Sequence, residues 1–255
     1  VAMEVALGAS IGGARSFCGM KHVGLNVAAD PLYTAGYTGV TAGMVIAVAD
    51  DPGMHSSQNE QDSRHHAIAS KTMMIEPSDS GECKEFAKAA FELSEKFDVP
   101  VIVRLSTRVS HSQSAVELCE REERENIPYE KNIQKYVMMP GNAIRRHPVV
   151  EARMKAIADY AETSPLNKVE MNDTKIGVIT SGISYQYAKE ALGDKLGACQ
   201  LPTVTINGEA KSLKSFAGSK VAGVNPNSKN PKVAMQFAAF LASTDGQLLR
   251  YQVRS

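Results

Sequence analysis

The sequence has no net charge and no long apolar run, and both absences exclude classes of protein. Its 28 lysine and arginine residues balance 28 aspartate and glutamate residues, so it lacks the basic surface typical of nucleic-acid-binding proteins. No apolar run approaches the roughly 20 residues that cross a bilayer, and the start, Val1-Ala2-Met3-Glu4, does not resemble a signal peptide. We therefore expect a soluble protein that binds neither nucleic acid nor membrane.

Cysteine is scarce and scattered, which argues against several kinds of metal centre. The cysteines form no CxxC pair, and no histidine stands beside them at metal-ligand spacing. The pattern fits isolated, mostly buried thiols in a reducing compartment, so we expect a cytoplasmic protein without its own zinc or iron–sulfur site. The four residues are Cys18, Cys83, Cys119 and Cys199.

Apolar segments alternate with segments of helical periodicity over the first 192 residues, which predicts an α/β fold with a parallel sheet. A chain of 255 residues can form one large domain or two small ones. We expect strands at 16–20, 44–49, 73–75, 100–105 and 175–182, and helices at 1–13, 79–97, 147–160 and 184–192. The last strand and helix would begin a second Rossmann-like unit, and Gly8 and Gly12 predict close packing of the first helix.

From Leu201 the pattern changes. Residues 201–214 predict a hairpin about Asn207-Gly208, the dipeptide that most strongly favours a tight β-turn. A strand at 221–225 and helices that begin near Ser228 and Ser243 would follow. A second Rossmann-like unit should continue with parallel strands and helices, and this segment does not.

The stretch from Met44 to His66 is the most informative part of the chain. Six small or apolar residues without polar alternation predict a strand covered on both faces, and Asp50-Asp51-Pro52-Gly53 then ends that strand. Ligands bind beyond the carboxyl ends of the strands in open α/β sheets. The polar segment after the turn, which includes Arg64, is either a binding loop or a solvated connector, and its spacing alone leaves both open.

Three other segments carry polar or charged residues whose role, in binding or in contact with solvent, depends on the expected fold. Residues 21–26 would form a second loop that opens a helix, where amides at the helix start can face an anion, although a structural role for its lysine and histidine is also open. Arg104 at the end of an expected strand would meet an anionic group or reach water. Glu117–Glu125 is a charge run, which indicates a solvated connector.

Long motifs in order make residues 1 to about 192 resemble the alpha subunit of indolepyruvate ferredoxin oxidoreductases, which belong to the 2-oxoacid oxidoreductases. The resemblance implies an α/β fold, the three-layer pyrimidine-binding module of thiamine diphosphate enzymes with a parallel sheet, truncated at its N-terminus and followed by a fragmentary second α/β unit. The motifs are MKHVGLNVAADP (20–31), VADDPGMHSSQNEQDSR (48–64), EPSDSGECKEF (76–86), EKFDVPVIVR (95–104), YEKNIQKYVMMP (129–140) and IGVITSGISYQYAKEAL (176–192).

The resemblance also implies cofactors and partners for the complete parent enzyme. These are thiamine diphosphate with magnesium, [4Fe-4S] clusters, a beta subunit, ferredoxin, coenzyme A and a 2-oxoacid substrate. The family's catalytic glutamate would lie just upstream of Val1, and Glu4 stands about one helical turn too late to replace it. The diphosphate-binding module and the cysteine clusters are also missing, so we expect this chain alone to bind no cofactor and to turn over no substrate.

Eight residues match the motifs at positions where this family would line the pyrimidine or substrate pocket. They would contact the carboxylate of the 2-oxoacid or the edge of the cofactor ring by electrostatic stabilisation. Three belong to the first loop and five to the second: Lys21, His22 and Asn26, and then Asp50, His55, Ser57, Gln58 and Asn59.

The end of the chain carries the motifs AKEALGDKLGACQLPTVTINGE (188–209), SFAGSKVAGVNPNSKN (215–230) and AMQFAAFLASTDGQLLRY (234–251). By these motifs, residues from about 186 to 255 resemble a different family, the carboxyl end of maltose or maltodextrin solute-binding proteins of ABC transporters, which are exported. The two resemblances overlap at Ala188–Asp194, which suggests a chimera joined there. Two alternatives for the function remain open. One is an extracellular maltodextrin-binding protein of an ABC transporter, although Tyr185, Tyr187 and Tyr251 offer few aromatic sugar contacts, and the other is a chimera without function. The expected domains are the pyrimidine module (1–116), a connector with a helix (117–172), the start of the second unit (173–192) and the solute-binding-like segment (193–255).

Overall fold

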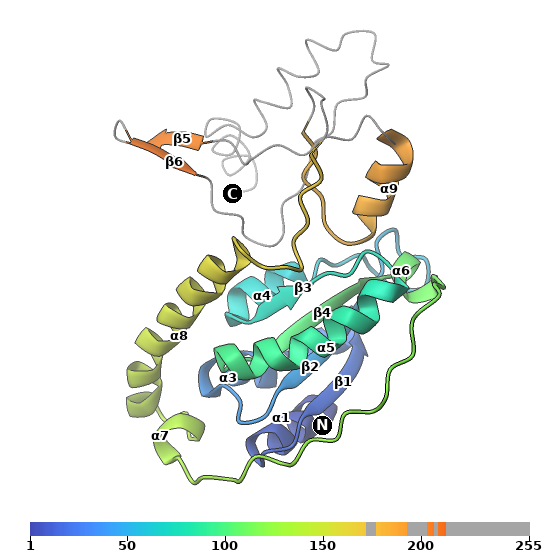
Figure 1. Cartoon of the computed structure of the whole chain (residues 1–255). Coiled ribbons are helices and arrows are strands. Elements are labelled where there is room, and N and C mark those ends of the chain that lie inside the picture. Colours follow the sequence, from blue (N-terminus) through green and yellow to red (C-terminus); the bar gives the residue numbers. More distant parts are fainter. Residues whose placement is uncertain (172–176, 193–202, 207–208, 213–255) are drawn as a thin grey trace.

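The computed structural model describes residues 1–171, 177–192, 203–206 and 209–212 (Figure 1). Its centre is a parallel sheet of four strands in the order β1-β2-β4-β3. The strands are β1 (Ser16–Lys21), β2 (Met44–Asp50), β3 (Met73–Ile75) and β4 (Val101–Ser106). All four coincide closely with strands expected from the sequence, and the predicted α/β class with a parallel sheet is confirmed.

Strand β2 lies between β1 and β4 and is covered on both faces, as its uninterrupted apolar run predicted. Phe17 pairs with Val45 in the register on one side, and Val45 pairs with Val101 on the other. Val45 and Ile46 are both fully buried, but they belong to separate clusters on opposite faces of the sheet. Each such side chain contributes roughly 1.5–3 kcal/mol by burial, so this strand anchors both halves of the core.

Helices cover both faces of the sheet, which gives three layers (Figure 1). On one face, apolar residues of four helices pack with Met44, Ile46 and Val48. On the other face, α5 packs with Val45 and Val101. The helices of the first face are α1 (Ala2–Ile11), α2 (His22–Val27), α3 (Ala29–Thr38) and α4 (Arg64–Ser70), and α5 spans Ser80–Phe97.

Helix α5 begins where the sequence predicted. The Asp79 carboxylate accepts a hydrogen bond from the amide of Glu82 at 2.8 Å, which satisfies one amide of the first helical turn. Phe86, Ala90 and Leu93 are buried at helical spacing, as expected for core packing. The predicted role of Gly8 in α1 was wrong, because Gly8 is exposed and α1 instead buries three other residues, Met3, Ala6 and Ser10.

The connector after β4 differs from expectation in its helix. It contains α6 (Thr107–His111), α7 (Ile133–Tyr136) and α8 (Pro140–Ala161), and the charge run between α6 and α7 is exposed, as predicted. Helix α8 begins at Pro140 rather than at His147, because proline at a first helical position loses no needed hydrogen bond. Pro148 lies inside helix α8. Arg146 before this proline and Arg153 after it donate hydrogen bonds to backbone carbonyls of α3 and so anchor the helix.

Helix α8 contacts both α3 and α5, which belong to opposite layers, so it closes one edge of the sandwich. In the described residues after α8, helix α9 (Ile183–Leu192) is followed by a hairpin of β5 (Thr203–Ile206) and β6 (Glu209–Ser212). Both were expected from the sequence. The strand predicted at 175–182 was wrong over 178–182, where no strand forms, while its first two residues lie outside the described residues. The strand at 221–225 and the helices near Ser228 and Ser243 also lie outside them.

Candidate functional site

The four parallel strands end at one edge of the sheet, and polar side chains gather there. Lys21 ends β1 opposite Ala49, and Asp50 ends β2 opposite Ser106 of β4. A parallel arrangement places these ends side by side, so the loops that follow them meet. This is the geometry from which the sequence predicted a site.

The end of strand β1 meets the loop after β2 through the side chain of Lys21. Its Nζ donates hydrogen bonds to the carbonyl oxygen of Ser56 at 2.7 Å and to the Ser56 hydroxyl at 3.2 Å. The same ammonium lies 3.9 Å from the Asp51 carboxylate. Strand β1 and the loop after β2 are therefore joined by one cation, although 35 sequence positions separate Lys21 from Ser56.

The carboxylate of Asp51 organises the second loop. It is 2% exposed and accepts hydrogen bonds from the Ser56 amide at 2.8 Å, the Ser57 hydroxyl at 2.6 Å and the Thr107 hydroxyl at 2.7 Å. Donation by the Ser57 and Thr107 hydroxyls holds the pKa of Asp51 well below its ordinary value. Sequence reasoning placed Asp50 and Ser57 in the site but missed this residue. The serines soon after an aspartate are the pattern that could have revealed it.

Three of the predicted site residues point their side chains toward solvent. His55, Gln58 and Asn59 are all exposed on this loop. The Asn59 side-chain oxygen accepts from Gln61 at 2.8 Å, and the His55 ring lies against Gly53, whose φ of 84° makes the turn. These side chains are therefore presented at the strand edge rather than packed in the core.

The expected loop at 21–26 is instead a helix. Helix α2 begins directly after β1, with Lys21 as its N-cap residue and Gly24 inside it. His22 is fully buried; its Nδ1 lies 3.4 Å from the carbonyl oxygen of Ala49, and its Nε2 has no hydrogen-bond partner. Asn26 is exposed, and its side-chain oxygen lies 3.1 Å from Nε2 of His66. Asn26 therefore takes no part in the contacts of Lys21. Nε2 of His22 is buried without a hydrogen-bond partner.

Asp50 lies in a different network from Asp51. Its carboxylate is 1% exposed and accepts from the amide of Ser63 at 2.9 Å, from the Ser63 hydroxyl and from Nε of Arg104 at 2.6 Å. These bonds tie the end of β2 to the start of α4 and to β4. Arg104, for which the sequence left water and an anion open, therefore meets an anionic group.

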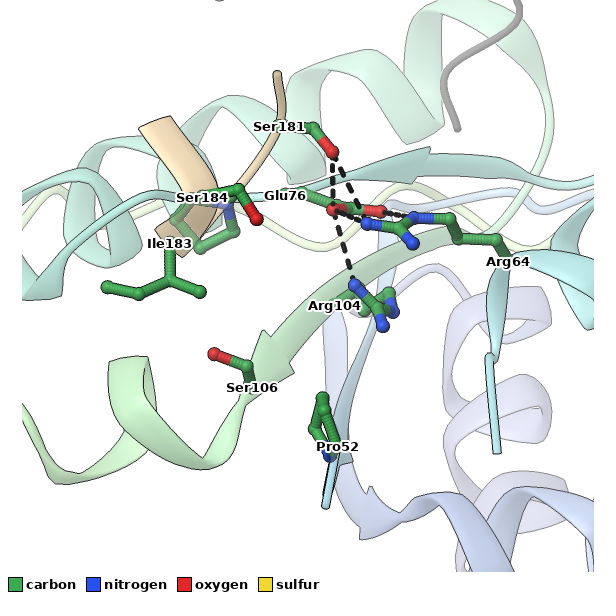
Figure 2. A pocket seen from close by; sticks show the side chains of 10 residues that line it. Pro52, Arg64, Glu76, Arg104, Ser106, Ser181, Ile183 and Ser184 are labelled. Carbon is green, nitrogen blue, oxygen red and sulfur yellow. Dashed lines mark hydrogen bonds and ion pairs between the residues drawn. The ribbon is translucent and has the colours of Figure 1, made fainter. Parts of the chain in front are cut away.

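A cavity of about 170 Å³ opens beside this second network (Figure 2). Arg64 binds Glu76 through two nitrogens at 2.5 and 2.8 Å, and Nη1 of Arg104 binds the same carboxylate at 3.3 Å. The Ser181 hydroxyl donates to Glu76 at 3.1 Å. Sequence reasoning did not connect Glu76 or Ser181 with the site, because residues 105 positions apart carry no shared pattern.

The charges around this cavity do not favour an anionic ligand. Asp50, Asp62 and Glu76 provide three carboxylates, whereas Arg64 and Arg104 provide two guanidinium groups, each already paired. Among the residues that the structure describes, no group of three or more histidine, cysteine, aspartate or glutamate side chains could hold a metal ion. Nor does any described helix have the length and apolarity to cross a membrane.

Comparison with known proteins assigns the family. Residues 1–176 match the thiamine-diphosphate-binding family of pyruvate flavodoxin/ferredoxin oxidoreductases. The chain belongs to that family, and its three-layer fold with a parallel sheet is the fold that the sequence predicted. The resemblance stated for the first 190 or so residues is thereby confirmed.

The more specific relatives are indolepyruvate oxidoreductases. The chain is 45% identical over 194 residues to the indolepyruvate oxidoreductase subunit IorA of Archaeoglobus fulgidus, a match that covers 75% of this chain and 31% of that protein. It is 44% identical over 210 residues to subunit IorA of Methanothermobacter thermautotrophicus, with 81% and 34% covered. The chain thus spans about a third of the length of these relatives.

A solved structure supports the same fold. The 2-oxoglutarate:ferredoxin oxidoreductase of Magnetococcus marinus, determined with 2-oxoglutarate, coenzyme A and succinyl-CoA bound, superposes with a TM-score of 0.53. That match covers 76% of this chain and 42% of the other, at 17% sequence identity. At so low an identity the likeness concerns the fold alone.

Proposed function

We propose that this chain forms one wall of the cofactor and substrate pocket of a 2-oxoacid:ferredoxin oxidoreductase. The reaction would be the oxidative decarboxylation of an aryl-2-oxoacid, such as indolepyruvate, to its acyl-coenzyme A. A partner subunit, ferredoxin and coenzyme A would complete the reaction, in the cytoplasm. The names of the relatives support this substrate class, and the term subunit in them supports a partner chain.

The single observation that carries the proposal is the junction of Lys21 with the loop after β2. The hydrogen bond from Lys21 to Ser56 places a cation beside exposed donors at the carboxyl edge of a parallel sheet, where α/β proteins bind ligands. His55, Gln58 and Asn59 can bind a substrate carboxylate or a ring edge there. For the polar segment after β2, a role as a binding loop is therefore favoured over a role as a solvated connector.

The described residues fit the heterocyclic end of thiamine diphosphate in one respect. Nδ1 of His22 lies 3.4 Å from the carbonyl oxygen of Ala49, and a proton on Nδ1 would leave the buried, unpaired Nε2 as an acceptor. An amino group on a ring would satisfy it. When bound, the cofactor supplies the carbanion chemistry, while Asp50 holds the end of β2 and Ser57 holds the loop. Magnesium and [4Fe-4S] clusters belong to the complete enzyme in this proposal.

A domain exchange tests this function. Residues 1–176 of this chain would replace the matching segment of the Methanothermobacter thermautotrophicus subunit. The rest of that subunit would keep its own sequence. We expect the hybrid, assembled with its partner subunit, to reduce ferredoxin with indolepyruvate and coenzyme A, and to prefer indolepyruvate to pyruvate and 2-oxoglutarate. The 255-residue chain alone should show no measurable affinity for thiamine diphosphate with magnesium in titration calorimetry.

Each outcome of these experiments tests a different part of the proposal. A hybrid that assembles and binds thiamine diphosphate but reduces no ferredoxin with any of the three 2-oxoacids would overturn the proposed function. A preference for pyruvate or 2-oxoglutarate would overturn the substrate class alone. Tight, magnesium-dependent binding of thiamine diphosphate by the 255-residue chain would contradict the proposal that it is half of a site. The unmodified relative is the control for the assay.

We further propose that the segment from about residue 186 derives from a solute-binding protein and that the chain is a chimera joined near Ala188–Asp194. The motifs of that segment, AKEALGDKLGACQLPTVTINGE (188–209), SFAGSKVAGVNPNSKN (215–230) and AMQFAAFLASTDGQLLRY (234–251), support this origin. In this proposal the segment takes no part in the oxidoreductase pocket.

A further inference from the structure

We infer that Asp51 is the positioning residue of the candidate site: its buried carboxylate fixes the loop that presents His55, Gln58 and Asn59. The inference deepens the proposed function and rests on it for the identity of the ligand, a 2-oxoacid. Its structural part rests on the contacts of Asp51 and of the loop that it holds, and not on the identity of the ligand.

The carboxylate of Asp51 is saturated with hydrogen bonds. An ionised carboxylate has about four acceptor positions, and four donors of this chain occupy them. Oδ1 accepts from the amide of His55 at 3.2 Å and the hydroxyl of Thr107 at 2.7 Å, while Oδ2 accepts from the amide of Ser56 at 2.8 Å and the hydroxyl of Ser57 at 2.6 Å. Asp51 has no acceptor position left for a ligand, so it acts through the residues that it holds.

The donors to Asp51 come from different elements of the fold. Thr107 begins α6 directly after β4, and His55, Ser56 and Ser57 belong to the loop after β2. Lys21, at the end of β1, adds an ammonium 3.9 Å from Oδ2. One carboxylate thus links the carboxyl ends of three neighbouring strands, and the loop between them cannot move without breaking several of these bonds.

Backbone amides and side chains of the loop after β2 face in different directions. The amides of His55 and Ser56 are bonded inward to Asp51, and the Glu60 carboxylate accepts from the amide of Gly53 at 3.0 Å. The side chains of His55, Gln58 and Asn59 point outward and are exposed. A solvated connector needs no such internal support, whereas a binding loop benefits because ordering it in advance lowers the entropic cost of binding.

The pH behaviour follows from the same hydrogen bonds. They hold the pKa of Asp51 well below its ordinary value in the folded chain. A carboxylate with a lowered pKa stabilises its surroundings at any pH above the unfolded value of about 3.9, and this stabilisation is lost only as pH falls through the lower folded value. The loop should therefore stay ordered throughout the neutral and mildly acidic range.

Amide hydrogen exchange on the 255-residue chain tests whether Asp51 holds the loop. In Asp51→Asn we expect the amides of His55 and Ser56 to exchange about tenfold faster or more, while β2 and β4 amides keep their rates. Ser57→Ala should give a smaller increase, and Ser57→Thr, which keeps the hydroxyl, should restore protection. Ser110→Ala, an exposed serine on α6, is the matched control.

Kinetics of the hybrid enzyme test whether this order matters for the ligand. We expect Asp51→Asn to raise KM for indolepyruvate about tenfold with a much smaller change in kcat and unchanged loading with thiamine diphosphate. Unaltered exchange at His55 and Ser56, or loosened exchange with unaltered KM, would overturn the inference. An inactive hybrid with wild-type Asp51 would instead overturn the proposed function, and the exchange data would still decide whether Asp51 holds the loop.

Discussion

Asp50 and Asp51 are adjacent in the sequence, yet their carboxylates serve different networks. Side chains alternate between opposite directions along an extended chain, so Asp50 reaches Ser63 and Arg104 while Asp51 reaches Ser57 and Thr107. Asp50 thereby fixes the start of helix α4, and Asp51 fixes the course of the polar loop. No inspection of the dipeptide alone distinguishes the two roles.

Gln58 provides the sharpest test of a single exposed side chain. In the hybrid enzyme we expect Gln58→Ala to lower kcat/KM for indolepyruvate by about tenfold or more, because a lost hydrogen bond to a charged group costs roughly 1.5–3 kcal/mol. The free energy of unfolding, followed by thermal denaturation, should change by less than about 0.5 kcal/mol, since the side chain is exposed. Gln113→Ala, exposed in the connector, is the matched control. Turnover equal to that of the control would return the loop to the role of a connector.

At the scale of elements, the connector is held to the sheet module by charge. Asp98, the residue after α5, pairs with Lys135 of α7 at 2.8 Å and with Arg146 and Arg153 of α8 at 3.2 and 3.5 Å. It also accepts from the amide of Val40 at 2.9 Å. These contacts explain why α8 stays docked although an internal proline removes one of its backbone hydrogen bonds.

Substitutions at Asp98 should separate its charge from its backbone role. Asp98 has a φ of 53°, a left-handed conformation that asparagine tolerates better than alanine. We expect Asp98→Ala to lower the free energy of unfolding by about 1–3 kcal/mol, and Asp98→Asn by less, because its amide oxygen can still accept from Val40. Urea unfolding followed by circular dichroism measures both. Equal losses for the two variants would contradict the backbone part of this account.

At the scale of the whole molecule, the described core belongs to the sheet module and its connector. The two buried apolar clusters of the described residues draw their members from between Met3 and Ile157. Helix α9, by contrast, has no buried residue and contacts the module mainly through polar side chains, such as Gln186 with Asp79 at 3.1 Å. The buried apolar residues of the described part thus all precede α9.

Truncation tests whether this core depends on the residues after α9. We expect a chain that ends at Leu192 to unfold with the same midpoint, within about 2 °C, as the 255-residue chain, because none of the described core lies beyond this point. Differential scanning calorimetry on both chains makes the comparison, and the Asp98→Ala variant shows that the method detects real destabilisation. A midpoint lower by 5 °C or more would show that residues 193–255 stabilise the module and would contradict a junction near Ala188–Asp194.

The sequence by itself determined the fold class, the four strands of the sheet and several helices, but not helix α2 or the start of α8. Period-two and period-3.6 patterns are local, so the β2 run, the Asp79 cap of α5 and the hairpin strands could be predicted from neighbouring residues. It also located the edge at which the candidate site lies, since Asp50-Asp51-Pro52-Gly53 ends the central strand. Long motifs identified the family, because so many matches in the same order are specific.

The tertiary structure decided which side chains meet. Lys21 with Ser56, Asp51 with Thr107 and Glu76 with Ser181 are brought together by the strand order β1-β2-β4-β3 and by chain connections that no local pattern specifies. Whether a polar side chain lines a surface or supports a loop depends on what packs against it. The sequence therefore located the loop, and the packing revealed that a buried aspartate beneath it keeps it in place.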